Sequence, residues 1–331
     1  MKNSIVILIT GLIVGLAVAA CQQRDSFYVN VQRSDVFFQA YDDHKYDFLW
    51  VFDNSASMVG RRDFVKQNMQ RFADILNSRK AIDYQMAIVT TDYFNDEGAL
   101  VTGSGGRQVV TSVSPTAIAD FQDLISHISD SATSFWEQGL LSAKQGLYLH
   151  AAEFSRPGVP LVVIFLTDEE DYSCKDDCFG VQPEDNSNWK PYSTDYFVKY
   201  FQGIKAQENT DVFLFPIVGK SLSACEVASL GSRYMDVASQ IGGASLSGSI
   251  CDSDMKASFE QIAQTIADRG VRFKLSNQAS GKNLAVFVNR VAVPFAPENY
   301  VYEASTNSVL FTGAIPRNGD IVEVGYSQET K

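Results

Sequence analysis

The sequence predicts an α/β fold: a doubly wound, mostly parallel sheet flanked by helices, followed by a small antiparallel β-sandwich domain. From about residue 46 to residue 270, apolar segments of strand length alternate with segments that have one apolar stripe at helical spacing. From residue 271 to residue 331, apolar residues instead recur at every second position, and no helical stripe appears. Of the 331 residues, 45% are apolar, which is enough to form the core of one large domain and a smaller companion.

Residues 1–20 have the features of an export signal. Lys2 precedes an apolar run that is interrupted by glycines and is short for a membrane-spanning helix, which needs about 20 apolar residues. The string VAAC at 18–21 resembles a bacterial lipobox, so we expect Cys21 to carry lipid and to anchor the protein in the cell envelope. Gln22 implies outer-membrane sorting, facing the periplasm or the outside, by resemblance to enterobacterial lipoproteins. An ordinary signal peptide with a chance cysteine is the alternative.

The composition is acidic. The formal net charge of −12 becomes −13 when Lys2 is removed with the signal. A negative surface disfavours nucleic acid and anionic lipid as direct partners, because both are negatively charged, and it suits divalent cations. The polar residues 21–45 are predicted to form a tether between the lipid and the folded part.

The elements of residues 46–270 follow from their side-chain patterns. Continuous apolar runs indicate strands buried on both faces of a parallel sheet, and apolar residues three or four apart indicate amphipathic helices. The predicted strands are Phe48–Phe52, Tyr84–Thr91, Leu161–Leu166 and Val212–Val218, with an edge strand or hairpin within 99–112. The predicted helices are one striped by Val65, Met69, Phe72 and Leu76, and four over 116–128, 136–152, 194–207 and 255–267.

The last 61 residues have the alternation of half-buried antiparallel strands. Apolar side chains occupy alternate positions near 284–288 and again at 322–326, where the turn residues Pro316, Asn318 and Gly319 precede them. A short apolar strand is predicted at 307–311. This segment is therefore predicted to be the small β-sandwich domain.

Oxygen-bearing side chains follow two of the predicted strands. Asp53, Ser55 and Ser57 occupy alternate positions after the first strand, so in an extended segment they point to one side. Asp168 follows the strand Leu161–Leu166. If these strands are neighbours, their carboxyl ends place both acids at one edge of the sheet. Two carboxylates, two hydroxyls and water suit Mg²⁺; the alternative is that the motif only caps the next helix.

This arrangement resembles a von Willebrand factor A (vWA) domain with a metal-ion-dependent adhesion site. The family's Asp-x-Ser-x-Ser motif falls on residues 53–57, and its later aspartate falls on Asp168. The family also places a threonine before a central helix, for which Thr133 is the candidate and Ser134 the alternative. The resemblance covers residues 46–270 and implies a Rossmann-like doubly wound domain. It also implies bound Mg²⁺, with Mn²⁺ or Ca²⁺ as alternatives, and a coordination position filled by an Asp or Glu carboxylate of a partner protein.

The resemblance thus implies an adhesion module and not an enzyme. One rival interpretation is a permanent subunit of an envelope assembly with a structural metal, and another is a metal-dependent hydrolase. A phosphohydrolase with Asp53 as nucleophile would need an acid at position 55, where Ser55 stands. The sequence has no Gly-x-Ser-x-Gly elbow, and its three histidines suit no metal centre at a predicted strand end: His44, His127 and His150.

Four further cysteines are predicted to form two disulfides in the exported protein. Proximity in the chain favours Cys174 with Cys178 and Cys225 with Cys251, among three pairings that four cysteines allow. A zinc site is the alternative, although the Cys-x3-Cys spacing is unusual for zinc.

The acidic run 169–171 follows Asp168 directly, and Asp176 and Asp177 lie nearby in the sequence. Three interpretations are open: a solvated loop, a device that repels acidic partners unless they reach the metal, and a second, weak calcium site.

Overall fold

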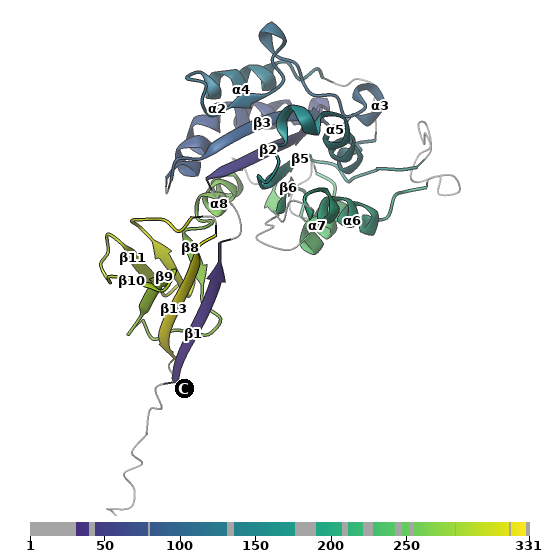
Figure 1. Ribbon diagram of the computed structural model, residues 1–331. Coiled ribbons are helices and arrows are strands. Elements are labelled where there is room, and N and C mark those ends of the chain that lie inside the picture. Colours follow the sequence, from purple (N-terminus) through teal and green to yellow (C-terminus); the bar gives the residue numbers. More distant parts are fainter. Residues whose placement is uncertain are drawn as a thin grey trace, which may run out of the picture.

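The structure is a computed structural model, and it describes most of the chain from residue 31 to residue 328. The described residues are 31–39, 44–78, 80–130, 136–175, 190–206, 211–220, 228–241, 247–251, 255–281, 283–317 and 319–328. They form a larger α/β part and a smaller β part (Figure 1). Among these residues, no helix has the length and apolar character needed to cross a bilayer.

The α/β part is built on a six-stranded sheet with the order β4-β3-β2-β5-β6-β7. Neighbouring strands are parallel except for β4, which runs antiparallel to β3. This agrees with the α/β fold and parallel sheet that the sequence predicted. The strands are β2 (Lys45–Phe52), β3 (Asp83–Thr90), β4 (Val110–Thr111), β5 (Leu161–Leu166), β6 (Val212–Val218) and β7 (Gly248–Ser249).

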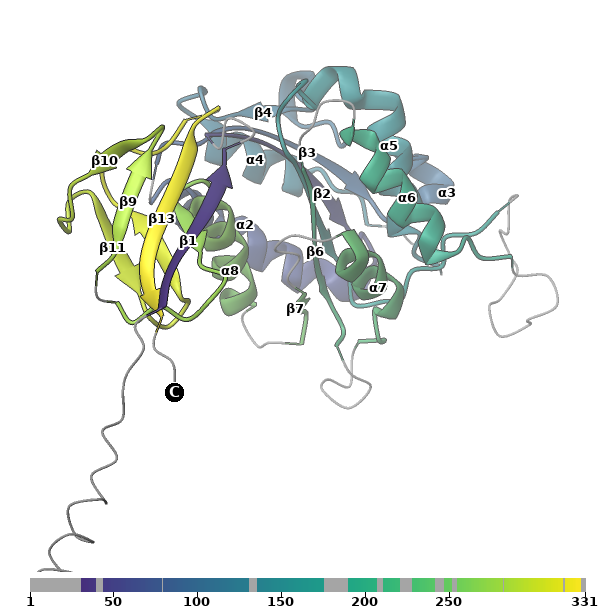
Figure 2. The same cartoon turned by 60° about the horizontal axis from the view of Figure 1, so that its bottom comes forward.

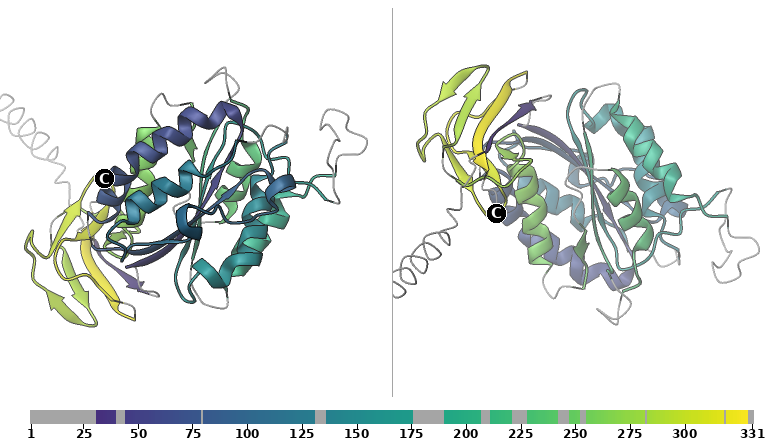
Figure 3. Two further views of the ribbon diagram at one scale, coloured as in Figure 1. Left: turned by 90° about the horizontal axis from the view of Figure 1, so that it is seen from above. Right: turned by 90° about the horizontal axis from the view of Figure 1, so that it is seen from below.

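Helices cover both faces of this sheet (Figures 2 and 3). One face is covered by α2 (Val59–Leu76), α4 (Ala117–Ser126) and α8 (Lys256–Ala267). The other face is covered by α5 (Gly139–Phe154), α6 (Thr194–Ile204) and α7 (Ser232–Ile241). The short helices are η1 (Ala56–Met58), α3 (Tyr93–Asp96) and η2 (Ser104–Gly106).

The central strand β2 shows why the sequence has continuous apolar runs. Phe48, Trp50 and Phe52 point into the core under α2, α4 and α8, whereas Leu49 and Val51 point into the core under α5, α6 and α7. All five side chains are fully buried. A strand with a helical layer on each face has no solvent side, so both sets of alternate positions are apolar.

The β part consists of two antiparallel sheets, with the orders β1-β13-β9-β10 and β11-β12-β8. Side chains of both sheets share one hydrophobic core, which includes Phe273, Tyr300 and Tyr326. The sequence predicted antiparallel strands here; the finer description as a β-sandwich stays a prediction. The strands are β1 (Val31–Phe38), β8 (Arg272–Lys274), β9 (Ala285–Val288), β10 (Val291–Val293), β11 (Tyr300–Glu303), β12 (Ser308–Phe311) and β13 (Ile321–Gln328).

Strand β1 corrects the predicted tether. Residues 31–38, which we assigned to the polar tether 21–45, pair along their whole length with β13 (Figure 1). The Phe37 ring lies 5.2 Å from that of Phe273 in the β core, and the Asp35 carboxylate accepts the Ser276 N–H at 2.7 Å. The β part therefore contains the described amino-terminal strand as well as the carboxy-terminal residues. The prediction was wrong because the polar side chains of this edge strand hid its alternation.

Two further differences concern the edges of the α/β part. The hairpin predicted within 99–112 contributes only the short β4. Helix α7 was missed, although Tyr234, Val237, Ala238 and Ile241 form an apolar stripe, of which the first three are buried.

Candidate metal site

Two neighbouring strands of the sheet, β2 and β5, end at the same level. Phe52 pairs with Leu166, and the backbone N–H of Asp53 donates to the Leu166 carbonyl at 2.9 Å. Because the strands are parallel, their carboxyl ends meet at one edge of the sheet. The structure therefore brings Asp53 and Asp168 to the same edge, as the sequence led us to expect.

The two serines lie with these acids. The Ser55 N–H donates to Asp53 Oδ1 at 2.8 Å, and the Ser55 and Ser57 hydroxyl oxygens are 2.9 Å apart. The Ser57 hydroxyl donates to Asp168 Oδ1 at 3.1 Å, which joins the two strand ends. We refer to Asp53, Ser55, Ser57 and Asp168 as the oxygen cluster.

Arg62 of α2 fixes the loop that carries three of these residues. Its Nη1 donates to the Asp53 carbonyl at 3.0 Å and to the Ser55 carbonyl at 3.1 Å. Its Nη2 binds the Asp130 carboxylate. The arginine is buried. Arg62 thereby fixes the backbone of the loop at Asp53 and Ser55.

The Asp168 carboxylate is incompletely satisfied. It is 2% exposed, and its buried Oδ2 has no hydrogen-bond partner among the described residues. Nη1 of Arg61 lies 3.9 Å from this oxygen, too far for a hydrogen bond. A buried acceptor without a donor is costly. A cation at Oδ2 would satisfy it.

Additional acids surround the oxygen cluster. Glu137 is almost fully buried and accepts a hydrogen bond from the Thr91 hydroxyl. Burial, and after it the negative charge of Asp53, raises the pKa of Glu137 to about 9 and that of Glu169 to about 7. The same two causes raise the pKa of Asp168. Carboxyl groups that oppose one another's ionisation mark a place where positive charge would be stabilising.

Sequence reasoning missed several of these neighbours. Thr91 and Thr167 directly follow β3 and β5, and Thr167 donates to Asp53 Oδ2 at 2.7 Å. The rule that polar residues after parallel strands meet at one edge would have found both. No local pattern distinguishes Glu137, because its burial results from how the loop before α5 packs.

The predicted loop ligands Thr133 and Ser134 lie outside the described residues. The chain before them is tied to the site, because Asn54 Nδ2 donates to the Ser129 carbonyl at 3.0 Å and Arg62 binds Asp130. A role for Thr133 or Ser134 stays a prediction.

The acidic run 169–171 is partly structural. Asp171 is fully buried and accepts bonds from the Leu140 N–H at 3.0 Å and from Arg233 Nε at 3.1 Å. Glu170 accepts the Arg233 N–H at 3.1 Å at the start of α7. The solvated-loop interpretation is therefore wrong for Asp171, whose carboxylate joins the loop after β5 to α5 and α7.

Two of the cysteines can be placed. Cys174 and Cys251 are each disulfide-bonded. The other three, Cys21, Cys178 and Cys225, lie outside the described residues, so the pairing and the lipid attachment stay predictions. A sulfur in a disulfide has no thiolate to offer to zinc, which disfavours the zinc interpretation for these two.

The donor set of the oxygen cluster fits a hard cation. It offers carboxylate and hydroxyl oxygens and no sulfur or imidazole. In the part of the chain that the structure describes, no three acidic, cysteine or histidine side chains are grouped as metal ligands. A cation here would therefore depend on the serine hydroxyls as well as on the two aspartates.

No family model and no curated protein matches the chain. Among solved structures it is similar to the pilus adhesin SpaC from Lactobacillus rhamnosus GG, with 10% identity and a TM-score of 0.45, over 93% of this chain and 42% of SpaC. It is also similar to a von Willebrand factor type A protein from Catenulispora acidiphila, with 12% identity and a TM-score of 0.40, over 93% of this chain and 67% of that one. A third similar structure is the PilB minor pilin from Streptococcus sanguinis, with 12% identity and a TM-score of 0.44, over 70% and 63% of the two chains.

This chain spans less than half the length of SpaC. All three TM-scores are below 0.5. What the oxygen cluster does therefore has to be inferred from its own residues.

Proposed function

We propose that this protein is a divalent-metal-dependent binding module of the cell envelope. In this proposal the oxygen cluster holds Mg²⁺, and the metal binds an Asp or Glu carboxylate of a partner protein. The observation that carries the proposal is the buried Oδ2 of Asp168, which has no hydrogen-bond donor among the described residues, whereas Oδ1 of the same carboxylate accepts from Ser57. Oxygen ligands favour Mg²⁺, with Mn²⁺ or Ca²⁺ as alternatives. The site would be of the vWA adhesion type that the sequence resembles.

Each residue has a distinct part in this proposal. Asp53 is oriented by the Ser55 N–H and by the Thr167 hydroxyl, so both of its oxygens are fixed. Asp168 would balance the second positive charge of the cation. The hydroxyls of Ser55 and Ser57 are neutral, and Ser57 is exposed, so this side of the cluster is open to solvent. Thr133, or Ser134, is proposed as an additional neutral ligand.

The bound cation would supply a positive charge that attracts an incoming carboxylate. Hydroxyl ligands leave more of that charge uncompensated than carboxylates would. The cluster offers no nucleophile paired with a base, because Asp53 is followed two residues later by Ser55. We therefore propose binding and not catalysis.

Calorimetric titration of the purified protein with MgCl₂ tests the metal site. We expect saturable binding, and we expect Mg²⁺ to raise the midpoint of thermal unfolding, since a ligand that binds only the folded state stabilises it. EDTA should reverse both effects. If neither Mg²⁺, Mn²⁺ nor Ca²⁺ binds at millimolar concentration, the proposal is wrong.

A second measurement separates reversible adhesion from permanent assembly. Protein retained on beads is incubated with envelope extract in Mg²⁺ or in EDTA, and captured chains are identified. A partner that is lost in EDTA supports metal-dependent binding. A partner captured equally well in both, by protein that does bind Mg²⁺, would favour a permanent envelope subunit in which the metal is structural.

Membrane attachment through Cys21 is also proposed. Intact-mass spectrometry of protein purified from the envelope is expected to show a chain that begins at Cys21 and carries acyl groups, since one chain alone anchors weakly. The Cys21→Ser variant should lack them. A mature chain that begins elsewhere and carries no acyl group would contradict this prediction.

A further inference from the structure

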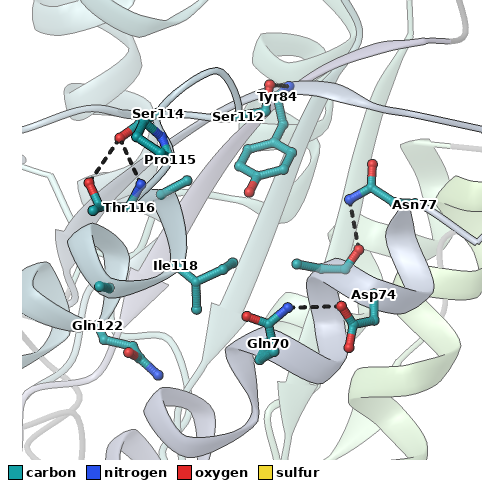
Figure 4. A pocket seen from close by; sticks show the side chains of 13 residues that line it. Gln70, Asp74, Asn77, Tyr84, Ser112, Ser114, Pro115, Thr116, Ile118 and Gln122 are labelled. Carbon is teal, nitrogen blue, oxygen red and sulfur yellow. Dashed lines mark hydrogen bonds between the residues drawn. The ribbon is translucent and has the colours of Figure 1, made fainter.

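A groove of about 730 Å³ lies between α2 and α4 (Figure 4). Its volume is within the range of sites that take small molecules, about 300 to 1,000 Å³. Amide, hydroxyl and small apolar side chains line most of it. The lining residues are Gln70, Ala73, Asp74, Asn77, Tyr84, Ser112, Ser114, Pro115, Thr116, Ala117, Ile118, Ala119 and Gln122. We refer to it as the α2–α4 groove.

The groove and the oxygen cluster are at opposite ends of the sheet. Tyr84 pairs with Tyr46 near the start of β2, whereas Asp53 follows the end of that strand, seven residues later. At the rise of a β-strand this separation is roughly 20 Å. A ligand in the groove would therefore not touch the proposed metal.

The charge of the lining excludes anionic ligands. Among the lining residues there is no Lys, Arg or His, and Asp74 is the single acid. A phosphate or carboxylate would find no positive partner there and would be repelled by Asp74. The groove therefore suits a neutral, hydrogen-bonding ligand.

Two lining groups have unused hydrogen-bonding capacity. Tyr84 is only 4% exposed, yet its hydroxyl points into the groove (Figure 4) and has no hydrogen-bond partner among the described residues. Burial raises the pKa of Tyr84, so this hydroxyl stays neutral. Asp74 accepts from Gln70 Nε2 at 2.8 Å through Oδ1, and it forms no ion pair within the described chain. The second carboxylate oxygen of Asp74 is thus available.

Other polar side chains of the lining are already engaged. Asn77 receives the Ile82 N–H at 2.8 Å and donates to the Ala73 carbonyl at 2.8 Å. Ser114 and Thr116 both bind the Asp120 carboxylate, at 3.1 and 3.0 Å. These bonds hold the walls in place, so the groove exists before any ligand binds.

We propose that the α2–α4 groove binds a short, neutral oligosaccharide. A sugar ring combines hydroxyls, which can donate to Asp74 and bond with Tyr84, with apolar C–H faces, which can lie against Pro115 and Ile118. A primary amine is less well matched, because an ammonium group has three N–H donors and the lining has only one acid to receive them. The proposal is independent of the metal site, so sugar affinity should be the same in Mg²⁺ and in EDTA.

Titration calorimetry with lactose, maltotriose and triacetylchitotriose as probes tests the proposal, with cadaverine as the cationic comparison. We expect at least one saccharide to bind. Tyr84→Phe should weaken that binding about 3- to 10-fold through loss of one hydrogen bond. Asp74→Asn should weaken it by about 10-fold or more, since bonds to a charged group are stronger. Ala119→Trp, which places a large side chain at an exposed position of the lining, should abolish it.

Matched controls lie on the other face of the sheet. Tyr148→Phe changes a tyrosine of α5 that is 73% exposed. Asp236→Asn changes an aspartate that binds Gln240 four residues away on α7, as Asp74 binds Gln70. Both should bind the saccharide like wild type. The proposal is wrong if no probe sugar binds, if Ala119→Trp binds as well as wild type, or if cadaverine binds and the sugars do not.

Discussion

The Asp168→Asn variant is expected to lose Mg²⁺ binding while remaining folded. The substitution removes one of the two negative charges of the oxygen cluster. Removing a residue that only hydrogen-bonds to a metal ligand already lowers metal affinity about 10- to 100-fold. Loss of a residue that binds the metal directly should therefore lower it at least about 100-fold. Titration calorimetry with MgCl₂ measures this directly.

Thermal unfolding without metal distinguishes a lost ligand from a damaged fold. Burial, and after it the nearby charge of Asp53, raises the pKa of Asp168, and Asp168 Oδ2 has no hydrogen-bond partner within the described chain. An uncharged amide relieves that repulsion, so the metal-free variant should unfold at the same temperature as wild type or higher. Asp195→Asn, on the surface of α6, is the matched control and should bind Mg²⁺ normally. An Asp168→Asn variant that binds Mg²⁺ like wild type would show that the cluster is not the metal site.

The Arg156→Met variant is expected to lose about 3 to 5 kcal/mol of stability, because it removes the hydrogen-bonded cationic partner of a buried carboxylate. Arg156 Nε donates to Asp47 Oδ1 at 2.8 Å, and the Arg156 N–H donates to Asp47 Oδ2 at 2.6 Å. Nη1 also binds Asp83 Oδ1 at 2.8 Å. Asp47 is fully buried at the start of the central strand β2. Urea unfolding monitored by circular dichroism measures the loss.

The pH dependence of this loss follows from Asp47. Burial raises its pKa to about 6, although Arg156 opposes the shift. A carboxyl whose pKa is higher in the folded state stabilises the fold at acid pH, and this contribution disappears as the pH rises through the folded pKa. Without Arg156 the ionised Asp47 carboxylate is destabilised further. The Arg156→Met substitution should therefore lower the free energy of unfolding more at neutral pH than at acid pH.

Two variants check the cause. Asp47→Asn combined with Arg156→Met should recover part of the stability at neutral pH, because the buried carboxylate that lost its arginine is then replaced by a neutral amide. Arg71→Met breaks a surface pair with Glu260, in which the arginine is 60% exposed, and should cost less than about 1 kcal/mol. A similar, small effect of both arginine substitutions would contradict the prediction.

Much of the candidate site could be predicted because its ligand types occur in a local pattern. Asp53, Ser55 and Ser57 are close in sequence and directly follow an apolar run, so their convergence needs only the end of a strand. Asp168 needed one further assumption, that β2 and β5 are neighbours, and the register of the sheet bears it out. Glu137 had no such pattern, since only the packed loop before α5 makes this acid a buried neighbour of Asp53.

The acidic run after Asp168 likewise could not be interpreted correctly from its local sequence. Charged residues in series usually indicate a solvated loop, but here the Leu140 N–H in the first turn of α5 and the Arg233 side chain of α7 both bond Asp171. Whether a carboxylate is exposed or buried depends on what packs over it. That is not a property of its own segment.

By itself, the sequence determined the α/β alternation, the central strands and the oxygen-bearing residues that follow them, because side-chain periodicity and strand ends are properties of adjacent residues. Only the tertiary structure decided that β1 belongs with β13, that Asp171 is a buried structural acid, and that a groove with one acid and no basic residue in its lining opens between α2 and α4. These features depend on contacts between segments far apart in the chain. The contacts that stabilise these features form only when the whole chain is folded, so no single segment of the sequence specifies them.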